Sequence, residues 1–213
     1  MELRDSKGSA RRPGGRKSRH GWRRKGRTPA RKAETRCRGL EGESRISHKM
    51  YKLTKDSDRK ANYHLMTETA KAFFEDETDL IALLSNLSAL INFYVDEINW
   101  VGFYFVKGKE LVLGPFQGLP ACTRIGEGKG VCGKAVLDGE TVIVPDVHSF
   151  PGHIACDSAS ASELVIPFFK DGEVYGVLDI DSPLPNRFGD LEAEYLGQIA
   201  AMLTECINNS TKK

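Results

Sequence analysis

Three of the five cysteines lie in the middle of the 213-residue chain: Cys122, Cys132 and Cys156. Thiols in such a group could bind a metal, form a structural disulfide or carry out redox and nucleophilic chemistry. Zinc is disfavoured because there is no Cys-x-x-Cys pair and because His148 and His153 are the only nearby histidines. A structural disulfide is disfavoured because no export signal is expected near the start of the sequence. Redox or nucleophilic chemistry is the leading interpretation.

Two further pairs of side chains could do chemistry, and the two members of each pair share one face of their own predicted strand. Alternation places Asp179 and Asp181 opposite a run of apolar residues. Two neighbouring carboxylates form a cation site, although a solvated strand end has the same pattern. Trp100 and Tyr104 also share a face. They could pack in a core, or they could form the wall of a pocket in which a cation or a soft sulfur rests against the rings.

The elements that position these residues follow from the spacing of apolar residues. Spacings of three and four predict helices, whereas apolar runs bounded by turn residues predict strands. Helices are expected over 61–74, 78–95, 131–137 and onward from Asp190, the expected N-cap. Strands are expected over 100–106, 110–116, 141–144, 163–169 and 173–181, with an irregular stretch over 145–160.

This order of elements predicts an α+β fold. Helices come at both ends of the pattern, and an antiparallel meander lies between them. We therefore expect a central antiparallel sheet with helices packed on one face. The other face must be covered by loops or left as a ligand pocket.

The formal charge of +2 averages two unlike segments. Residues 1–50 contain 17 Lys+Arg and 5 Asp+Glu, whereas residues 51–213 contain 14 and 24. The first segment is interpreted as a disordered basic tail or a non-native extension, which binds nucleic acid at most non-specifically. We expect residues 51–213 to form one catalytic domain that works without this tail. No apolar run approaches the roughly 20 residues of a membrane span, so no membrane association is expected.

Three motifs follow one another in the second segment. The first reads CTRIGEGKGVCG from Cys122, the second FPGHIACD from Phe150 followed by SASELVIP from Ser160, and the third VLDIDS from Val177. In this order they resemble the free methionine-(R)-sulfoxide reductases, enzymes built on a GAF domain. The resemblance covers roughly residues 60–208. It implies a GAF-like fold with helices on one face of the sheet and a ligand pocket under the cysteine loops on the other.

The resemblance also implies a reaction: reduction of free L-methionine (R)-sulfoxide to methionine. Thioredoxin would be the external reductant, with no bound cofactor or metal, in a cytoplasmic homodimer. By position in the motifs, Cys156 would be the nucleophile and Cys122 the leading resolving residue, with Cys132 as the second option. Attack on the sulfoxide leaves a sulfenic acid, which a second thiol converts to a disulfide.

The remaining site residues take their expected roles from the same resemblance. Glu163, Asp179 and Asp181 resemble the acidic pocket residues, which would bind the ammonium while one protonated carboxyl donates to the sulfoxide oxygen. Trp100 and Tyr104 would hold the ε-methyl group of the substrate.

Two other classes of protein compete with this interpretation. Many GAF domains are ligand sensors that feed an attached output domain. No output domain is expected here, because the predicted domain fills the chain after the tail, and three clustered cysteines have no purpose in plain sensing. A nucleic-acid-associated protein acting through the basic tail is the third class.

Overall fold

The structure, a computed structural model, describes residues 52–152 and 158–210, and these contain a six-stranded sheet. The strands are β1 (Trp100–Lys107), β2 (Glu110–Gly118), β3 (Arg124–Gly126), β4 (Val142–Val144), β5 (Ser162–Lys170) and β6 (Glu173–Ser182). They lie in the order β3-β2-β1-β6-β5-β4, and every neighbouring pair is antiparallel. The predicted central antiparallel sheet is confirmed. The predicted tail, residues 1–50, lies outside the described residues.

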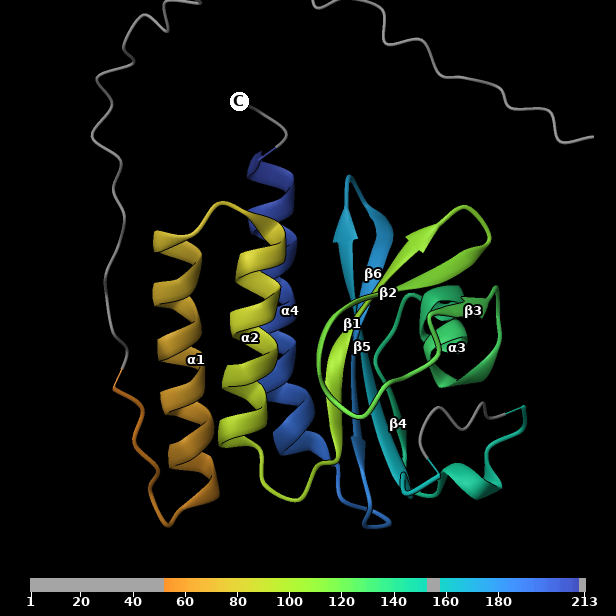
Figure 1. Ribbon diagram of the computed structural model, residues 1–213, viewed down its shortest axis with the longest axis horizontal. Coiled ribbons are helices and arrows are strands. Elements are labelled where there is room, and N and C mark those ends of the chain that lie inside the picture. Colours follow the sequence, from red (N-terminus) through yellow and green to blue (C-terminus); the bar gives the residue numbers. More distant parts are fainter. Residues whose placement is uncertain (1–51, 153–157, 211–213) are drawn as a thin grey trace, which may run out of the picture. The chain divides into compact units, whose positions relative to one another are not determined.

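Three helices cover one face of this sheet and a fourth lies on the other face (Figure 1). The three are α1 (Arg59–Asp76), α2 (Leu80–Tyr94) and α4 (Asp190–Ser210), and the fourth is α3 (Gly130–Asp138). Helices α2 and α4 contact the strands, and α1 packs against both of them. Helix α3 departs from the expectation that helices cover one face only. It lies on the opposite face because Val131, Cys132 and Ala135 are its buried side.

Alternation along β1, β5 and β6 divides the apolar side chains between the two faces. The core on the helical side contains Val101 and Phe103 of β1 together with the leucines of α2. Burial of each such side chain contributes roughly 1.5–3 kcal/mol. Trp100 and Tyr104 belong to a separate buried cluster on the α3 side. The strand pattern therefore predicts correctly which residues of β1 face the helices and which face the site.

The helix starts are set by short polar side chains. Asp58 Oδ2 accepts a hydrogen bond from the backbone N–H of Ala61 at 2.8 Å, which caps α1. The N-cap predicted at Asp190 is wrong by one residue, because α4 already begins there. Glu192 Oε2 instead accepts from the backbone N–H of Gly189 at 3.0 Å, as in a capping box.

A buried ion pair joins the helical layer to the sheet ends. Arg187 Nη1 donates to Glu192 Oε1 at 2.9 Å, and Arg187 Nη2 donates to the backbone oxygen of Asp96 at 2.8 Å. Tyr63 OH of α1 also donates to Glu192 Oε1 at 2.9 Å. Since Asp96 lies just before β1 and Arg187 just after β6, this network holds the two central strands against α1 and α4.

None of the helices in the described ranges could cross a membrane.

Candidate active site

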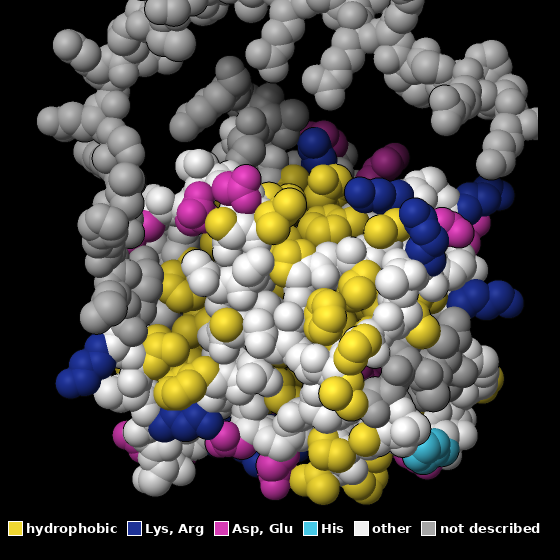
Figure 2. All heavy atoms as spheres, viewed as in Figure 1, with side chains coloured by type: hydrophobic (Ala, Val, Ile, Leu, Met, Phe, Trp, Pro, Cys, Tyr) yellow, Lys and Arg dark blue, Asp and Glu magenta, His cyan; other side chains and the backbone are white. Residues whose placement is uncertain are grey.

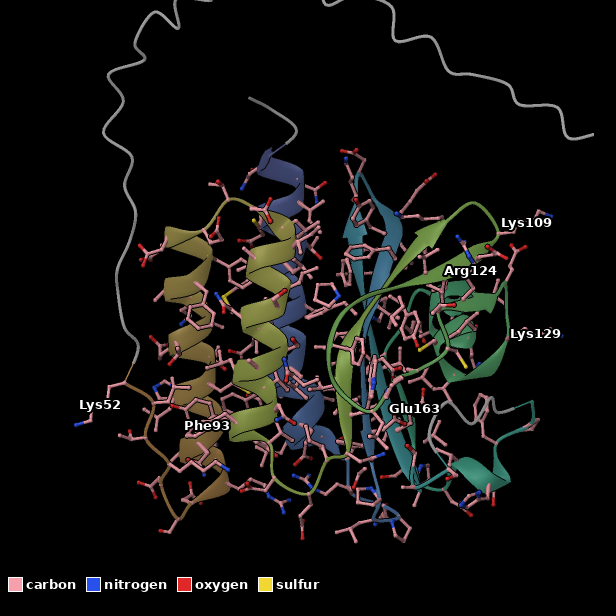
Figure 3. The ribbon with its side chains drawn as sticks, viewed as in Figure 1. Lys52, Phe93, Lys109, Arg124, Lys129 and Glu163 are labelled. Carbon is pink, nitrogen blue, oxygen red and sulfur yellow. The ribbon has the colours of Figure 1, made fainter. Side chains whose placement is uncertain are left out.

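The site is built on the face of the sheet that lies under α3. Strand register sets it: Gly102 lies opposite Asp179, and Trp100 lies opposite Asp181. On the other side of β6, Glu163 lies opposite Asp181. Because side chains alternate along a strand, these aromatic and acidic residues project from one face. Glu163 of β5 lies on the α3 side of the sheet (Figure 3).

A thiol and two carboxyl groups meet at the centre of this face. Cys132, in the first turn of α3, is in contact with Glu163, with 4.0 Å between Sγ and Oε1. The ligand atoms of Cys132, Glu163 and Asp179 all lie within 4.8 Å of one another. Each of the three residues is at most 6% exposed. Helix α3, β5 and β6 thus bring together three groups that are far apart in the sequence.

Burial changes the protonation of all three groups. It raises the pKa of Glu163 well above its usual range, and the nearby carboxyl of Asp179 raises it further. Burial also raises the pKa of Asp179 to about 6, although hydrogen bonds with Cys132 and Glu163 oppose the shift. The pKa of the Cys132 thiol is raised well above its usual value by burial and then by the two carboxyls. At neutral pH the site therefore holds a protonated thiol and at least one carboxyl that retains its proton.

One oxygen of this cluster is left without a hydrogen bond. Within the part of the chain that the structure describes, Asp179 Oδ1 is buried and has no hydrogen-bond partner. A buried acceptor in this state costs about 1–3 kcal/mol. A ligand that carries a donor or a positive charge would remove this cost, so the oxygen points to a binding function for the cluster.

A wall of stacked aromatic rings borders the carboxyl groups. The ring centroids of Trp100 and Tyr104 lie 5.9 Å apart, and those of Trp100 and Phe116 lie 5.4 Å apart. Gly102 makes this stacking possible, because a Cβ there would lie 2.4 Å from the Trp100 ring and 2.5 Å from the Cβ of Phe116. Trp100 Nε1 donates to the backbone oxygen of Leu119 at 3.1 Å, which orients the indole. The wall is an apolar surface next to acidic groups.

The aromatic wall also holds one of the cysteine loops. Tyr104 OH donates to the backbone oxygen of Cys122 at 2.9 Å. Cys122 is partly buried against the α3-side cluster and has a free thiol. Cys156 and His153 lie outside the described residues, so the predicted role of Cys156 as nucleophile stays a prediction.

The chain is similar to several known proteins. The GAF domain model matches residues 65–207. The chain is 46% identical over 142 residues to the free methionine-R-sulfoxide reductase of Escherichia coli, which covers 67% of this chain and 86% of that protein. It is 50% identical over 161 residues to Protein YtsP of Bacillus subtilis, covering 74% and 99% of the two chains. A solved structure of the free methionine-R-sulfoxide reductase from Neisseria meningitidis, in complex with its substrate, is 44% identical with a TM-score of 0.73, over 76% of this chain and 99% of that one.

The chain belongs to the GAF-domain family of free methionine-R-sulfoxide reductases. This confirms the family that the three motifs indicate, and it confirms the GAF-like fold. The individual roles of the cysteines and carboxyls in this reductase-family member stay predictions.

The structure brings most of the predicted site residues of this GAF-domain chain together. Glu163 and Asp179 join Cys132, and Trp100 and Tyr104 stack beside them. Asp181 lies outside the tight cluster, but its charge helps to raise the pKa values of Glu163 and Cys132.

Two contributors were missed by sequence reasoning, Phe116 and Gly102. Phe116 ends the predicted strand over 110–116, and it pairs with Gly102 across β1 and β2. The alternation along each strand was visible in the sequence. The register that places the large ring opposite the residue without a side chain was not.

The raised pKa of Asp179 leads to an expected effect on stability. In the unfolded chain an aspartate titrates near pH 3.9, whereas Asp179 in the folded chain titrates at about 6. The unfolded state therefore loses this proton first, and stability falls as the pH rises from about 4 to about 6. We expect Asp179→Asn to raise Tm at pH 8 by about 2–6 °C, which corresponds to about 1–2 kcal/mol, and to raise it less at pH 4.5.

Thermal unfolding at the two pH values checks this expectation. Asp138→Asn is the matched control, because Asp138 lies in an exposed pair with Lys134. Its Tm should stay within about 2 °C of the parent at both pH values. A lower Tm for Asp179→Asn at pH 8 would contradict the argument.

Proposed function

We propose that this chain reduces free L-methionine (R)-sulfoxide to L-methionine through a cysteine sulfenic acid and an intramolecular disulfide, which thioredoxin then reduces. The observation that carries the proposal is the buried cluster of Cys132, Glu163 and Asp179 beside the aromatic wall. The names of the relatives in Escherichia coli and Neisseria meningitidis support the same substrate.

The site matches the functional groups of a free amino-acid sulfoxide. The α-ammonium requires buried acceptors, and Asp179 Oδ1 is a buried acceptor without a donor among residues 52–152 and 158–210. Glu163 lies next to it and retains a proton because burial raises its pKa. It can therefore donate to the developing oxygen of the sulfoxide. The ε-methyl group would rest against Trp100 and Tyr104, since sulfur and its methyl substituent pack favourably on aromatic rings.

The chemical step needs a thiolate and an acid. The thiolate of Cys156 attacks the sulfoxide sulfur, the oxygen takes up protons and passes to the cysteine sulfur, and methionine leaves. The cysteine sulfur is oxidised to a sulfenic acid and the substrate sulfur is reduced. A second thiol then attacks the sulfenic sulfur, which forms a disulfide and releases water. A dithiol of thioredoxin exchanges with this disulfide and restores both cysteines. No bound cofactor is required, because the thiols supply both electrons.

The described thiols differ in how readily they can attack. The raised pKa of Cys132 keeps its thiol protonated, so it is a weak nucleophile in the free protein. Cys122 is more exposed and lies on a loop that Tyr104 holds against the site. Cys156 precedes Glu163, the buried acid of β5, by seven positions in the sequence. We therefore keep Cys156 as nucleophile, with Cys122 as the leading resolving residue and Cys132 as the second option.

A coupled assay tests the function. The full chain is mixed with free methionine sulfoxide, thioredoxin, thioredoxin reductase and NADPH, and NADPH consumption is followed. We expect consumption with the R epimer, and none with the S epimer or with peptide-bound methionine sulfoxide. Activity with dithiothreitol but not with thioredoxin would contradict thioredoxin as the partner, but it would still support reduction of the sulfoxide. No R-selective consumption with either reductant would favour a ligand-sensing module instead.

We also propose that the enzyme works as a cytoplasmic homodimer. The thiols of Cys122 and Cys132 are free, which fits a reducing compartment. The dimer is what the family resemblance implies. Light scattering of the eluted protein would report twice the mass of the chain, and a monomer mass at micromolar concentration would contradict the proposal.

A further inference from the structure

The acidic cluster has the donor set of a divalent cation site. Cys132 offers a sulfur, and Glu163 and Asp179 each offer a carboxylate oxygen. A sulfur ligand with two oxygens suits zinc, whereas magnesium and calcium prefer oxygen alone. The sequence argument against zinc relied on the lack of a Cys-x-x-Cys pair and on the few nearby histidines, and it did not consider carboxylate ligands. The cluster is assembled instead from α3, β5 and β6.

The distances are close to those that tetrahedral zinc requires. With Zn–S near 2.3 Å and Zn–O near 2.0 Å, neighbouring ligand atoms lie about 3.3–3.5 Å apart. Here Cys132 Sγ and Glu163 Oε1 lie 4.0 Å apart, and all three ligand atoms lie within 4.8 Å. Contraction by about 1 Å would complete three sides of the coordination shell. Rotations about side-chain bonds can supply a movement of this size.

A second observation points to a cation independently of these distances. Asp179 is only 6% exposed, and its Oδ1 has no hydrogen-bond partner among the described residues. The basic side chains of the β1–β2 turn, β3 and the loop before α3 do not supply the missing charge. Lys109, Arg124 and Lys129 are exposed and point away from the site (Figure 3), and basic side chains gather on the surface in that region (Figure 2).

We propose that the reduced protein binds one zinc-class divalent cation through Cys132 Sγ, Glu163 and Asp179, with water in the fourth position. Binding would deprotonate the thiol and bring positive charge to the unpaired oxygen. An ion in this position occupies the carboxyl groups that receive the substrate ammonium, so it inhibits the enzyme and shields Cys132 from oxidation. This inhibition rests on the proposed function, whereas the binding does not.

Cobalt(II) serves as a spectroscopic probe of the binding. Added to the reduced full chain, it should give the near-ultraviolet charge-transfer band of a cobalt–thiolate bond, and excess Zn²⁺ should remove this band. Cys132→Ser should lose the band. Cys206→Ser, the matched control in α4, should keep it. No band in the parent, or a band that survives in Cys132→Ser, would overturn the proposal.

The carboxylate ligands are tested by equilibrium dialysis with Zn²⁺. Cys132→Ser should remove one Zn²⁺ site from the dialysis curve. We expect Glu163→Gln to lower the Zn²⁺ affinity of that same site at least about tenfold. The matched exposed variant Glu68→Gln should leave it unchanged, because Glu68 lies in a surface pair with Lys71. Equal Zn²⁺ affinity in the two variants would overturn the assignment of the carboxylate. Circular dichroism confirms that each variant is folded.

The binding and activity results separate the two proposals. Loss of the cobalt band in Cys132→Ser supports the metal site even if no sulfoxide is reduced. R-selective turnover without any cobalt band would support the function and overturn the metal site. If both hold, Zn²⁺ should inhibit turnover at the concentration that saturates the dialysis curve, and turnover unaffected at that concentration would overturn the inhibitory role.

Discussion

Replacement of Cys156 by serine is expected to abolish reduction of free methionine (R)-sulfoxide. A serine hydroxyl is far less acidic and less nucleophilic than a thiol, and no sulfenic acid can form on it. Loss of the residue that forms the covalent intermediate should lower kcat by at least about 1,000-fold. Single-turnover formation of methionine by the reduced chain, without thioredoxin, is the measurement.

Variants of the other cysteines separate chemistry from recycling. Cys122→Ser should still form about one equivalent of methionine per chain and then stop, because its sulfenic acid lacks the leading resolving thiol. Cys206→Ser is the control and should keep full turnover, since Cys206 lies in α4 on the helical side of the sheet. If Cys156→Ser completed a single turnover and Cys132→Ser did not, Cys132 would be the nucleophile and Cys156 a resolving residue.

Replacement of Glu163 by glutamine is expected to lower kcat/KM by about 100-fold, a loss of about 2.7 kcal/mol of transition-state stabilisation. The amide is nearly isosteric and folds into the same place, but it is a much weaker acid than a protonated carboxyl. The amide also cannot ionise when the substrate binds, so it cannot supply a carboxylate to the ammonium. If proton donation dominates, kcat carries the loss; if ammonium binding dominates, KM carries it.

A carboxyl elsewhere on the domain provides the comparison. Glu68→Gln in α1 should leave kcat/KM unchanged within about twofold, because Glu68 is exposed and pairs with Lys71. The dependence of kcat on pH adds a second readout. An acid with a raised pKa should give an activity that falls toward high pH, and Glu163→Gln should lose this limb. Unchanged kcat/KM in Glu163→Gln would remove the residue from the site.

The helices and strands could be predicted because their patterns are local. Spacings of three and four along the sequence predict α1 and α2, since an apolar stripe needs only neighbouring turns. Alternation along β1 predicts which side Trp100 and Tyr104 share, because successive side chains of a strand point to opposite faces. Strand β3 was missed. It is three residues long, and its pairing with β2 is its main support.

By itself the sequence determined the secondary structure, the faces of the strands and, through its motifs, the family. The tertiary structure alone decided which of these faces meet. Cys132 and Glu163 are 31 positions apart in the sequence. Whether they are in contact depends on how α3, which follows a glycine-rich loop, packs against β5. That docking is a sum of many small packing terms that no local pattern encodes. The raised pKa values and the unpaired oxygen of Asp179 exist only in the packed site, because burial among other carboxyls produces them.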